Sequence, residues 1–290
     1  MKVEVPIVNA FVDENVGGNP AGVVLNAQQY SQDQKQRIAA AIGLSETAFV
    51  SPSSTADFKL EFFTPTRQIA HCGHATIATF NYLRQTGALP NDQTSKETID
   101  GRREILMEGD SAYMEQVAPR YTELNQENQL RAIYSLGLKP SDLLADEQPC
   151  VVNTGNSFLV IALRNSDVVK SVSPNMKLIS AMSEEYDLIG YYVFSPQAIK
   201  EGRDAGARMF GPHYGIDEES ATGMAAGPLA CYLYDKLKNN KGQYLIEQGH
   251  LMSPPSPSVI AVRLQTESGS ISSLMAGGKA AVSEVRSVET

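Results

Sequence analysis

The segment Ile69–Thr76 brings several chemically active side chains together at the predicted start of a helix. It contains His71, Cys72 and His74 within four positions. These side chains fit three kinds of chemistry: zinc ligation, attack by a thiolate whose pKa a helix N-terminus would lower, and proton transfer or anion binding by His74. A buried, hydrogen-bonded histidine without a chemical role is the fourth interpretation.

Zinc ligation is the weakest of these interpretations. A fourth ligand would have to come from His213, His250 or a distant carboxylate, and the sequence has no CxxC or HxxxH pair. The patterns GxGxxG, Walker A, HExxH and GxSxG are absent too, so the usual dinucleotide, nucleoside triphosphate, zincin and hydrolase signatures are missing. We expect no metal site.

Two acidic positions stand beside predicted elements. Glu46 lies between a helical segment and an apolar strand, where partial burial would suit it to act as a general base. Asp217–Glu219 precedes a second apolar helix, where acidic residues interact favourably with the helix dipole. At both places a capping role without chemistry is the alternative.

The elements that must position these residues are short strands and two unusual helices. Segments His74–Leu83 and Ala221–Tyr234 are apolar on nearly every face, which predicts helices buried all round. Ser31–Ile42 is an ordinary amphipathic helix with Ser31 as its N-cap, and Met176–Met182 is a weaker helix. Apolar runs bounded by Gly, Pro, Asn or Ser predict strands at Val3–Phe11, Gly22–Leu25, Ala48–Val50, Phe58–Phe63, Val151–Val152, Phe158–Leu163, Ile189–Phe194, Ala207–Phe210, Tyr244–Glu247 and Val259–Leu264.

Short internal matches indicate that the chain consists of two similar halves. Gly18-Asn19 before one strand corresponds to Gly155-Asn156 before another, and Phe63-Thr64-Pro65 corresponds to Phe210-Gly211-Pro212. Each Pro is followed, after about ten residues, by an Ala-Thr pair that opens an apolar helix, Ala75-Thr76 and Ala221-Thr222. We therefore expect two strand-rich layers, each wrapped on one buried helix.

The small residues at the two helix starts have a chemical consequence. Gly73 and Gly223 would let backbone N–H groups approach a ligand, and the positive end of each helix dipole favours an anion. Two such helix starts facing one cleft between the halves would hold a substrate that carries a carboxylate. The alternative is that both glycines only relieve packing.

Length and composition bound the remaining possibilities. The 290 residues favour two domains, for which we expect 1–118 with about 270–290, and 119–269. The polar segment Pro90–Gly109 is predicted to be a loop or an exposed hairpin. The polar segment Pro119–Gln129 is predicted to be the linker between the halves. With 24 Lys and Arg against 33 Asp and Glu, the net charge of −9 argues against a nucleic acid partner.

The sequence also predicts where the protein resides. The N-terminus lacks the features of a signal peptide, and the longest apolar run, Phe158–Leu163, is far too short to span a membrane. Three scattered cysteines are too few for a disulfide framework. We expect a soluble cytoplasmic protein with reduced thiols.

Several blocks resemble the signatures of the PhzF-like phenazine-biosynthesis isomerase family. These blocks follow the family's order and cover nearly the whole chain: Gly18–Val24, Leu44–Val50, Phe62–Pro65, Cys72–Thr76 and Glu218–Gly223. The resemblance implies an α/β fold of the diaminopimelate-epimerase type, with two similar halves that each curve a mostly antiparallel sheet around a central buried helix. It also implies a homodimer, and an active site without a cofactor in the cleft between the halves.

The resemblance also assigns roles to individual residues. It implies that Glu46 removes and returns a proton on the substrate, assisted by His74 and Glu219. Gly73 and Gly223 would lend backbone N–H groups to the substrate, a small carboxylate-bearing metabolite. Substrate binding would further involve two polar side chains, Asn19 and Thr222.

This sequence departs from the family pattern at three places. Glu219 replaces the usual aspartate, Met224 replaces a serine, and the block Met252–Ser256 lacks the family's arginine. These changes bear on the identity of the substrate. Related epimerases use two opposed thiols, and here Cys72 has no cysteine counterpart in Glu218–Gly223, so a single carboxylate base is preferred over a two-thiol epimerase.

Overall fold

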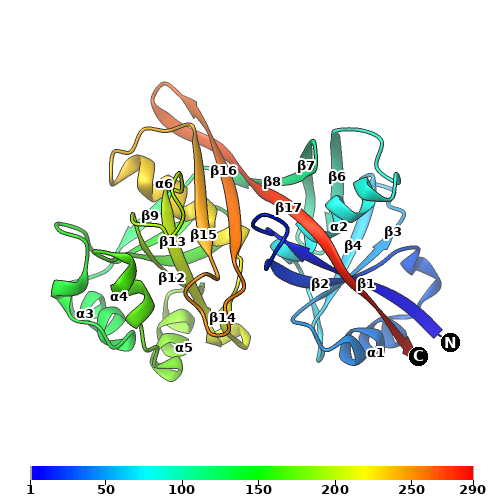
Figure 1. Cartoon of the computed structure of the whole chain (residues 1–290), viewed down its shortest axis with the longest axis horizontal. Helices are drawn as coiled ribbons and strands as arrows, with labels where there is room; N and C mark the ends of the chain where they lie inside the picture. Colours follow the sequence, from blue (N-terminus) through cyan, green and yellow to red (C-terminus); the bar gives the residue numbers. More distant parts are fainter. Residues whose placement is uncertain (1, 290) are drawn as a thin grey trace. The chain divides into compact units, whose positions relative to one another are not determined.

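The computed structural model describes residues 2–289, which form two compact units of mixed α/β structure (Figure 1). The first unit is Met1–Glu115 together with Gly277–Thr290, and the second is Gln116–Ala276. The chain passes between the units inside strands β8 (Ser111–Val117) and β17 (Ser270–Glu289). In Figure 1 the red C-terminal part of β17 runs beside the blue strand β1, with which it pairs.

The first unit is a mixed sheet with two helices. Its remaining elements are β1 (Lys2–Ala10), β2 (Asn19–Val24), η1 (Ala27–Gln29), α1 (Gln32–Ile42), β3 (Thr47–Ser51), β4 (Phe58–Phe63), β5 (Gln68–Ile69), α2 (Gly73–Gln85), β6 (Gln93–Thr98) and β7 (Gly101–Glu108). Strand β1 is antiparallel to β2 and β17, β2 is parallel to β3, and β3 is antiparallel to β4. Strand β4 is antiparallel to β5 and parallel to β6, after which β6, β7 and β8 continue antiparallel.

The second unit uses the same set of pairings. Its elements are β9 (Arg120–Glu123), α3 (Gln126–Ser135), η2 (Pro140–Asp142), β10 (Cys150–Asn153), β11 (Ser157–Ala162), α4 (Ser166–Ser171), α5 (Met176–Glu185), β12 (Leu188–Ser195), β13 (Ala205–Gly211), η3 (Pro212–Tyr214), β14 (Ile216–Glu219), α6 (Gly223–Asp235), β15 (Gln243–Gln248) and β16 (Ser258–Glu267). Strands β11 and β12 are parallel, as are β13 and β15. The pairs β9–β10, β10–β11, β12–β13, β13–β14 and β15–β16 are antiparallel.

The two units therefore repeat one topology. Helix α1 connects the parallel strands β2 and β3, and α4 and α5 connect the equivalent parallel strands β11 and β12. Helix α2 lies between the parallel strands β4 and β6, and α6 lies between the equivalent parallel strands β13 and β15. This confirms the prediction of two similar halves. The proposed sequence match at the helix starts is wrong in register, because Ala75 lies inside α2 whereas Ala221 precedes α6. The equivalent helix starts are Gly73 and Gly223.

Both connecting helices are buried on nearly all sides, as the apolar patterns predicted. Ten of the thirteen residues of α2 and ten of the thirteen of α6 are buried. Helix α2 contacts β1, β2 and β3, and α6 contacts β10, β11 and β16. Although these helices are apolar, none of the helices in the described part of the chain has the length and hydropathy needed to cross a bilayer.

The polar side chains of α2 are accommodated by hydrogen bonds to backbone carbonyls. Thr76 Oγ1 donates to the Cys72 carbonyl at 2.6 Å and Thr79 Oγ1 donates to the Ala75 carbonyl at 2.7 Å. Asn81 Nδ2 donates to the carbonyls of Ile77 and Gly278. Because a buried polar group without a partner is costly, these bonds to the preceding turn let a helix that contains Thr and Asn remain buried.

The peripheral helices cover the sheets with separate hydrophobic clusters. Helix α1 begins with the capping box that its sequence predicts, since Ser31 Oγ accepts the Gln34 N–H and Gln34 Oε1 accepts the Ser31 N–H. Its apolar side chains pack with alternate residues of β1, among them Val3, Val5 and Ile7. In the second unit, α3, α4 and α5 pack with β11, β12 and β13 around a larger cluster.

The structure corrects one predicted linker and resolves one ambiguous segment. Pro119–Gln129 is not an irregular linker: it contains β9, which pairs with β10, and the start of α3. The side chains of β9 are mostly exposed, so backbone hydrogen bonds rather than apolar burial hold this strand, and hydrophobic periodicity could not reveal it. Pro90–Gly109 forms the hairpin of β6 and β7 rather than a loop.

A buried lysine supports the beginning of α2. Lys96 on β6 is fully buried; its Nζ donates to Thr76 Oγ1 at 2.5 Å and lies 3.1 Å from His71 Nδ1. Its Nζ also lies 5.3 Å from the ring centroid of Phe62. Burial lowers the pKa of Lys96 well below its usual range. The pKa of His71 is also lowered well below its usual range, by burial and by the charges of Lys96 and Arg103.

Replacing Gly190 by alanine should destabilise the second unit strongly. A Cβ at Gly190 would lie 2.3 Å from the backbone carbonyl oxygen of Phe210 on the neighbouring strand β13, so the two strands would have to separate. We expect a loss of about 2–3 kcal/mol in the free energy of unfolding, measured by urea titration. Gly242→Ala is the matched control, because its Cβ would meet nothing within 4 Å, and it should change stability by less than about 0.5 kcal/mol.

Replacing Lys96 by methionine should change how stability depends on pH. Because burial lowers the pKa of Lys96, the unfolded chain binds a proton there at pH values where the folded chain does not, and this group makes stability rise with pH. Lys96→Met removes that contribution. Urea unfolding at pH 7.5 and 9.5 should show the variant's stability relative to the wild type falling as pH rises, by at most about 1.4 kcal/mol per pH unit. A difference that stays constant would show that Lys96 is charged in the folded protein.

Candidate active site

The structure brings Glu46 and His74 together at the beginning of α2. Glu46 immediately precedes β3, and its carbonyl accepts the N–H of Gly22 on the parallel strand β2 at 3.2 Å. His74 is the second residue of α2. Glu46 is 7% exposed and His74 4%, and their Oε2 and Nε2 atoms are 3.3 Å apart. A carboxylate and an imidazole from elements distant in sequence thus meet in a buried position.

Cys72 lies on the other side of the imidazole ring. It is the N-cap residue of α2, and its Sγ lies 3.5 Å from His74 Nδ1. Burial raises the pKa of the Cys72 thiol; the nearby His74 opposes this shift and Glu46 adds to it. The thiolate interpretation relied on a pKa lowered by the helix N-terminus, whereas burial shifts the pKa of this thiol in the opposite direction.

The same three side chains bear on the question of a metal site. Among the described residues, ligand atoms of Glu46, Cys72 and His74 lie within 4.8 Å of one another. His71 is not part of this group, because its Nδ1 faces Lys96. The two nitrogens of His74 face different neighbours, Nδ1 toward Cys72 and Nε2 toward Glu46, whereas an imidazole binds a metal ion through one nitrogen. Cys72 therefore lies beside one ring nitrogen of His74 and Glu46 beside the other.

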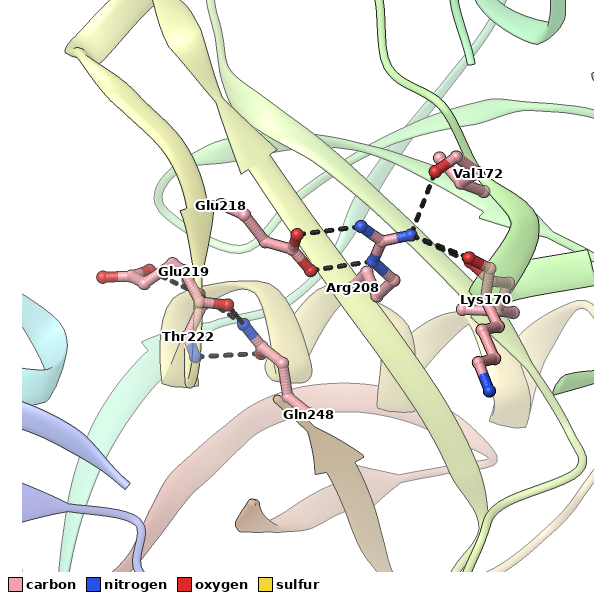
Figure 2. A network of polar contacts seen from close by, with 8 residues as sticks. Lys170, Val172, Arg208, Glu218, Glu219, Thr222 and Gln248 are labelled. Carbon is pink, nitrogen blue, oxygen red and sulfur yellow. Dashed lines mark hydrogen bonds and ion pairs between the residues drawn. The ribbon is translucent and has the colours of Figure 1, made fainter. Parts of the chain in front are cut away.

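The second unit has a polar network at the equivalent helix end. Thr222 is the N-cap of α6 and Glu219 is the last residue of β14. Thr222 Oγ1 donates to Glu219 Oε2, and Figure 2 shows this contact beside the side chain of Gln248. Gln248 Oε1 accepts the Thr222 N–H at 2.9 Å, and its Nε2 donates to the Glu219 carbonyl at 2.7 Å.

Glu218, the neighbour of Glu219, serves an anchoring role. Both Glu218 oxygens accept hydrogen bonds from Arg208, at 2.7 Å from Nε and 2.8 Å from Nη2. Arg208 Nη1 also donates to backbone carbonyls at the end of α4, including those of Lys170 and Val172 (Figure 2). Capping of α6 is therefore the wrong interpretation for Glu218 and Glu219, which contact side chains and lie before the first turn.

The other residues predicted to bind substrate occupy ends of elements. Asn19 is the first residue of β2 and is buried. Gly73 and Gly223 are the first residues of α2 and α6, so their N–H groups are among those that an α-helix cannot satisfy internally. The Gly223 carbonyl accepts Gln116 Nε2 at 2.9 Å.

Sequence reasoning did not identify several residues that support these sites. Four of them are buried polar side chains on strands: Lys96, Tyr192, Arg208 and Gln248. Tyr192 and Arg208 lie inside largely apolar strands, where an isolated polar residue is a signal that could have drawn attention to them. Lys96 and Gln248 have polar neighbours in the sequence and carry no such signal. Their partners lie 10 to 56 positions away along the chain, so the pattern alone could not name the contacts.

Comparisons with known proteins agree with this description. The sequence model for phenazine biosynthesis-like proteins matches residues 8–285. The uncharacterized isomerase YddE of Escherichia coli O157:H7 is 32% identical over 256 residues, which cover 86% of each chain. Trans-2,3-dihydro-3-hydroxyanthranilate isomerase of Pseudomonas chlororaphis is 30% identical over 262 residues, covering 86% of this chain and 87% of that protein.

Solved structures confirm the predicted fold class. The crystal structure of the Bacillus anthracis phenazine biosynthesis protein of the PhzF family superimposes with a TM-score of 0.90 at 25% identity, and the match covers 100% of both chains. Racemase-type proteins of much lower identity share the fold, in agreement with the diaminopimelate-epimerase type. The family match spans nearly the whole sequence, and the chain therefore belongs to the phenazine biosynthesis-like, or PhzF, family.

Proposed function

We propose that this protein is an isomerase that moves a proton on a small carboxylate-bearing metabolite without a metal ion or organic cofactor. The observation that carries the proposal is the buried contact between Glu46 and His74, with 3.3 Å between the carboxylate and the imidazole. The names of the relatives support the reaction class, since YddE is named an isomerase and the Pseudomonas chlororaphis protein a trans-2,3-dihydro-3-hydroxyanthranilate isomerase.

Such a reaction needs one group that both accepts and returns a proton. The Glu46 carboxylate removes a proton from a substrate carbon, and the carboxylic acid so formed gives the proton to another carbon of the same molecule. The double bond shifts and no electrons are gained or lost, so neither an oxidant nor a reductant is required. His74 Nε2, 3.3 Å from Glu46 Oε2, would interact with this carboxyl group while the charge of Glu46 changes.

The helix starts account for the preference for an anionic substrate. The first turn of α2 carries no acidic residue, and the Gly73 N–H at the positive end of the helix is suited to a carboxylate oxygen. We assign Gly223, Thr222, Glu219 and Asn19 to substrate binding, with Glu219 as the second acid–base group. The substitution of Met224 for the family's serine bears on which metabolite is accepted.

An amino-acid-type epimerase is the alternative reaction. Epimerases of this fold class use two thiols, one of which would be Cys72. Its structural counterpart at the N-cap of α6 is Thr222, and burial raises the pKa of the Cys72 thiol. Both observations favour the single carboxylate. A protein that only binds the metabolite would give no exchange of carbon-bound protons.

Glu46→Gln should abolish turnover while leaving binding nearly intact. Glutamine has almost the same shape as glutamate but cannot accept the proton, and a general base typically contributes about 10²–10⁴-fold to the rate. We expect kcat to fall by at least that factor and KM to change by less than about threefold. The assay follows isomerisation of trans-2,3-dihydro-3-hydroxyanthranilate, and incorporation of deuterium from heavy water, by NMR.

The control for this experiment is Glu115→Gln, the same substitution at an exposed position of β8 in the same unit. It should keep the wild-type kcat. If Glu46→Gln turns over like Glu115→Gln, then Glu46 is not the base and the proposed mechanism is wrong.

Cys72→Ser should be much milder than Glu46→Gln. Because burial raises the pKa of Cys72, the wild-type protein should show no thiolate absorbance at 240 nm at neutral pH. The pKa of the other two thiols, Cys150 and Cys231, is raised for the same reason, so they should not interfere. We expect kcat of Cys72→Ser within about tenfold of the wild type. A loss as large as that of Glu46→Gln would favour the epimerase.

A further inference from the structure

Gln248, at the end of β15, uses the full hydrogen-bonding capacity of its side chain. It is 1% exposed. Its Oε1 accepts from the Thr222 N–H and from the Tyr192 hydroxyl, both at 2.9 Å. Its Nε2 donates to the Glu219 carbonyl at 2.7 Å and to Thr222 Oγ1 at 3.1 Å. A side-chain amide offers two lone pairs and two N–H groups, so each of them is used here.

These contacts fix the direction of each hydrogen bond. The buried phenol of Tyr192 stays protonated, because burial raises its pKa, and it therefore donates to Gln248 Oε1. Gln248 Nε2 can only donate, so Thr222 Oγ1 accepts from it. The Thr222 hydroxyl then has its own proton available for Glu219, whose Oε2 it contacts. The bonds run in one direction, from Gln248 through Thr222 to Glu219.

Glu219 is held from two sides by this arrangement. On one side Arg208 clamps both oxygens of the preceding residue, Glu218. On the other side Gln248 binds the Glu219 carbonyl. Successive side chains of a strand point to opposite faces, so anchoring Glu218 on one face presents the Glu219 carboxylate on the other, as Figure 2 shows.

We propose that Gln248 is a positioning residue for the isomerase reaction: it orients the Thr222 hydroxyl toward the Glu219 carboxylate and occupies the Thr222 N–H. This inference rests on the proposed function, in which Glu219 and Thr222 act on the substrate. It also implies that Gly223, and not Thr222, provides the backbone N–H that the start of α6 offers to an anion.

The variants for the test differ in the donor that they remove. Gln248→Glu keeps the shape and the accepting oxygen but replaces the two N–H donors, so the Thr222 hydroxyl can turn to the introduced carboxylate instead of to Glu219. Gln248→Leu removes all four hydrogen bonds. Tyr192→Phe removes only the hydrogen bond from the Tyr192 hydroxyl to Gln248 Oε1 and leaves both N–H donors of Gln248 in place. Gln243→Glu makes the same chemical change at the exposed beginning of the same strand and is the matched control.

The first measurement needs no substrate. Amide hydrogen exchange at Thr222, followed by NMR, should be at least about tenfold faster in Gln248→Leu than in the wild type, because the N–H loses its acceptor. It should be unchanged in Gln243→Glu. Wild-type exchange rates at Thr222 in Gln248→Leu would overturn the assignment of its N–H to Gln248.

The second measurement distinguishes positioning from general stability. With trans-2,3-dihydro-3-hydroxyanthranilate as the probe, kcat of Gln248→Glu relative to the wild type should be reduced at least about tenfold at pH 8, the effect of one lost hydrogen bond. It should recover toward pH 6, where the introduced carboxyl regains a proton to donate. The titratable groups that face this position are Glu219 from β14, Tyr192 from β12, and Glu247 and His250 on its own segment.

The controls separate this inference from the proposed function. Gln248→Leu should be impaired at both pH values, because leucine has no proton to regain, and Tyr192→Phe should stay within about threefold of the wild type. If Gln248→Glu and Gln248→Leu lose the same activity at both pH values, Gln248 acts through stability alone and the inference is wrong. If the wild type does not convert the probe, or Glu46→Gln remains active, the proposed function fails while the amide exchange result still decides the assignment of Gln248.

Discussion

A helix that is buried on all sides must have its first N–H groups satisfied without the help of bulk water. The first four N–H groups of any α-helix lack acceptors within the helix. In α2 and α6, ten of thirteen residues are buried, so side chains at the helix start must fill this role or leave it to a ligand. This constraint explains the composition of both sites, because the side chains that contact the two helix starts are polar or titratable.

Both units place a buried polar side chain beside the start of the buried helix, from the same place in the repeated topology. The strand that follows each buried helix, β6 or β15, supplies a buried polar residue. In the first unit Lys96 donates to Thr76 and, through it, supports the Cys72 carbonyl. In the second unit Gln248 accepts from Thr222 directly. A duplicated backbone has thus been given two different buried supports, an amine in the first unit and an amide in the second.

Burial also decides which groups can take part in proton transfer. It lowers the pKa of Lys96 and His71 and raises that of the Cys72 thiol, so all three are driven toward their neutral forms. The carboxylates that remain at the two helix starts are Glu46, in contact with His74, and Glu219, in contact with Thr222. This distribution suits a reaction that moves a proton and needs no nucleophile.

The sequence by itself determined the two buried helices, the repeat of two halves and the family. Residues without a polar face can only be accommodated inside a protein, and signature blocks in fixed order are specific. It also singled out Glu46 and His74, whose roles stay predictions. Only the tertiary structure decided the direction in which the pKa of Cys72 shifts, because burial and neighbouring charges depend on contacts that sequence spacing does not show. The same holds for Gln248, since hydrogen bonds between distant strands follow from strand pairing and leave no periodic signal in the sequence.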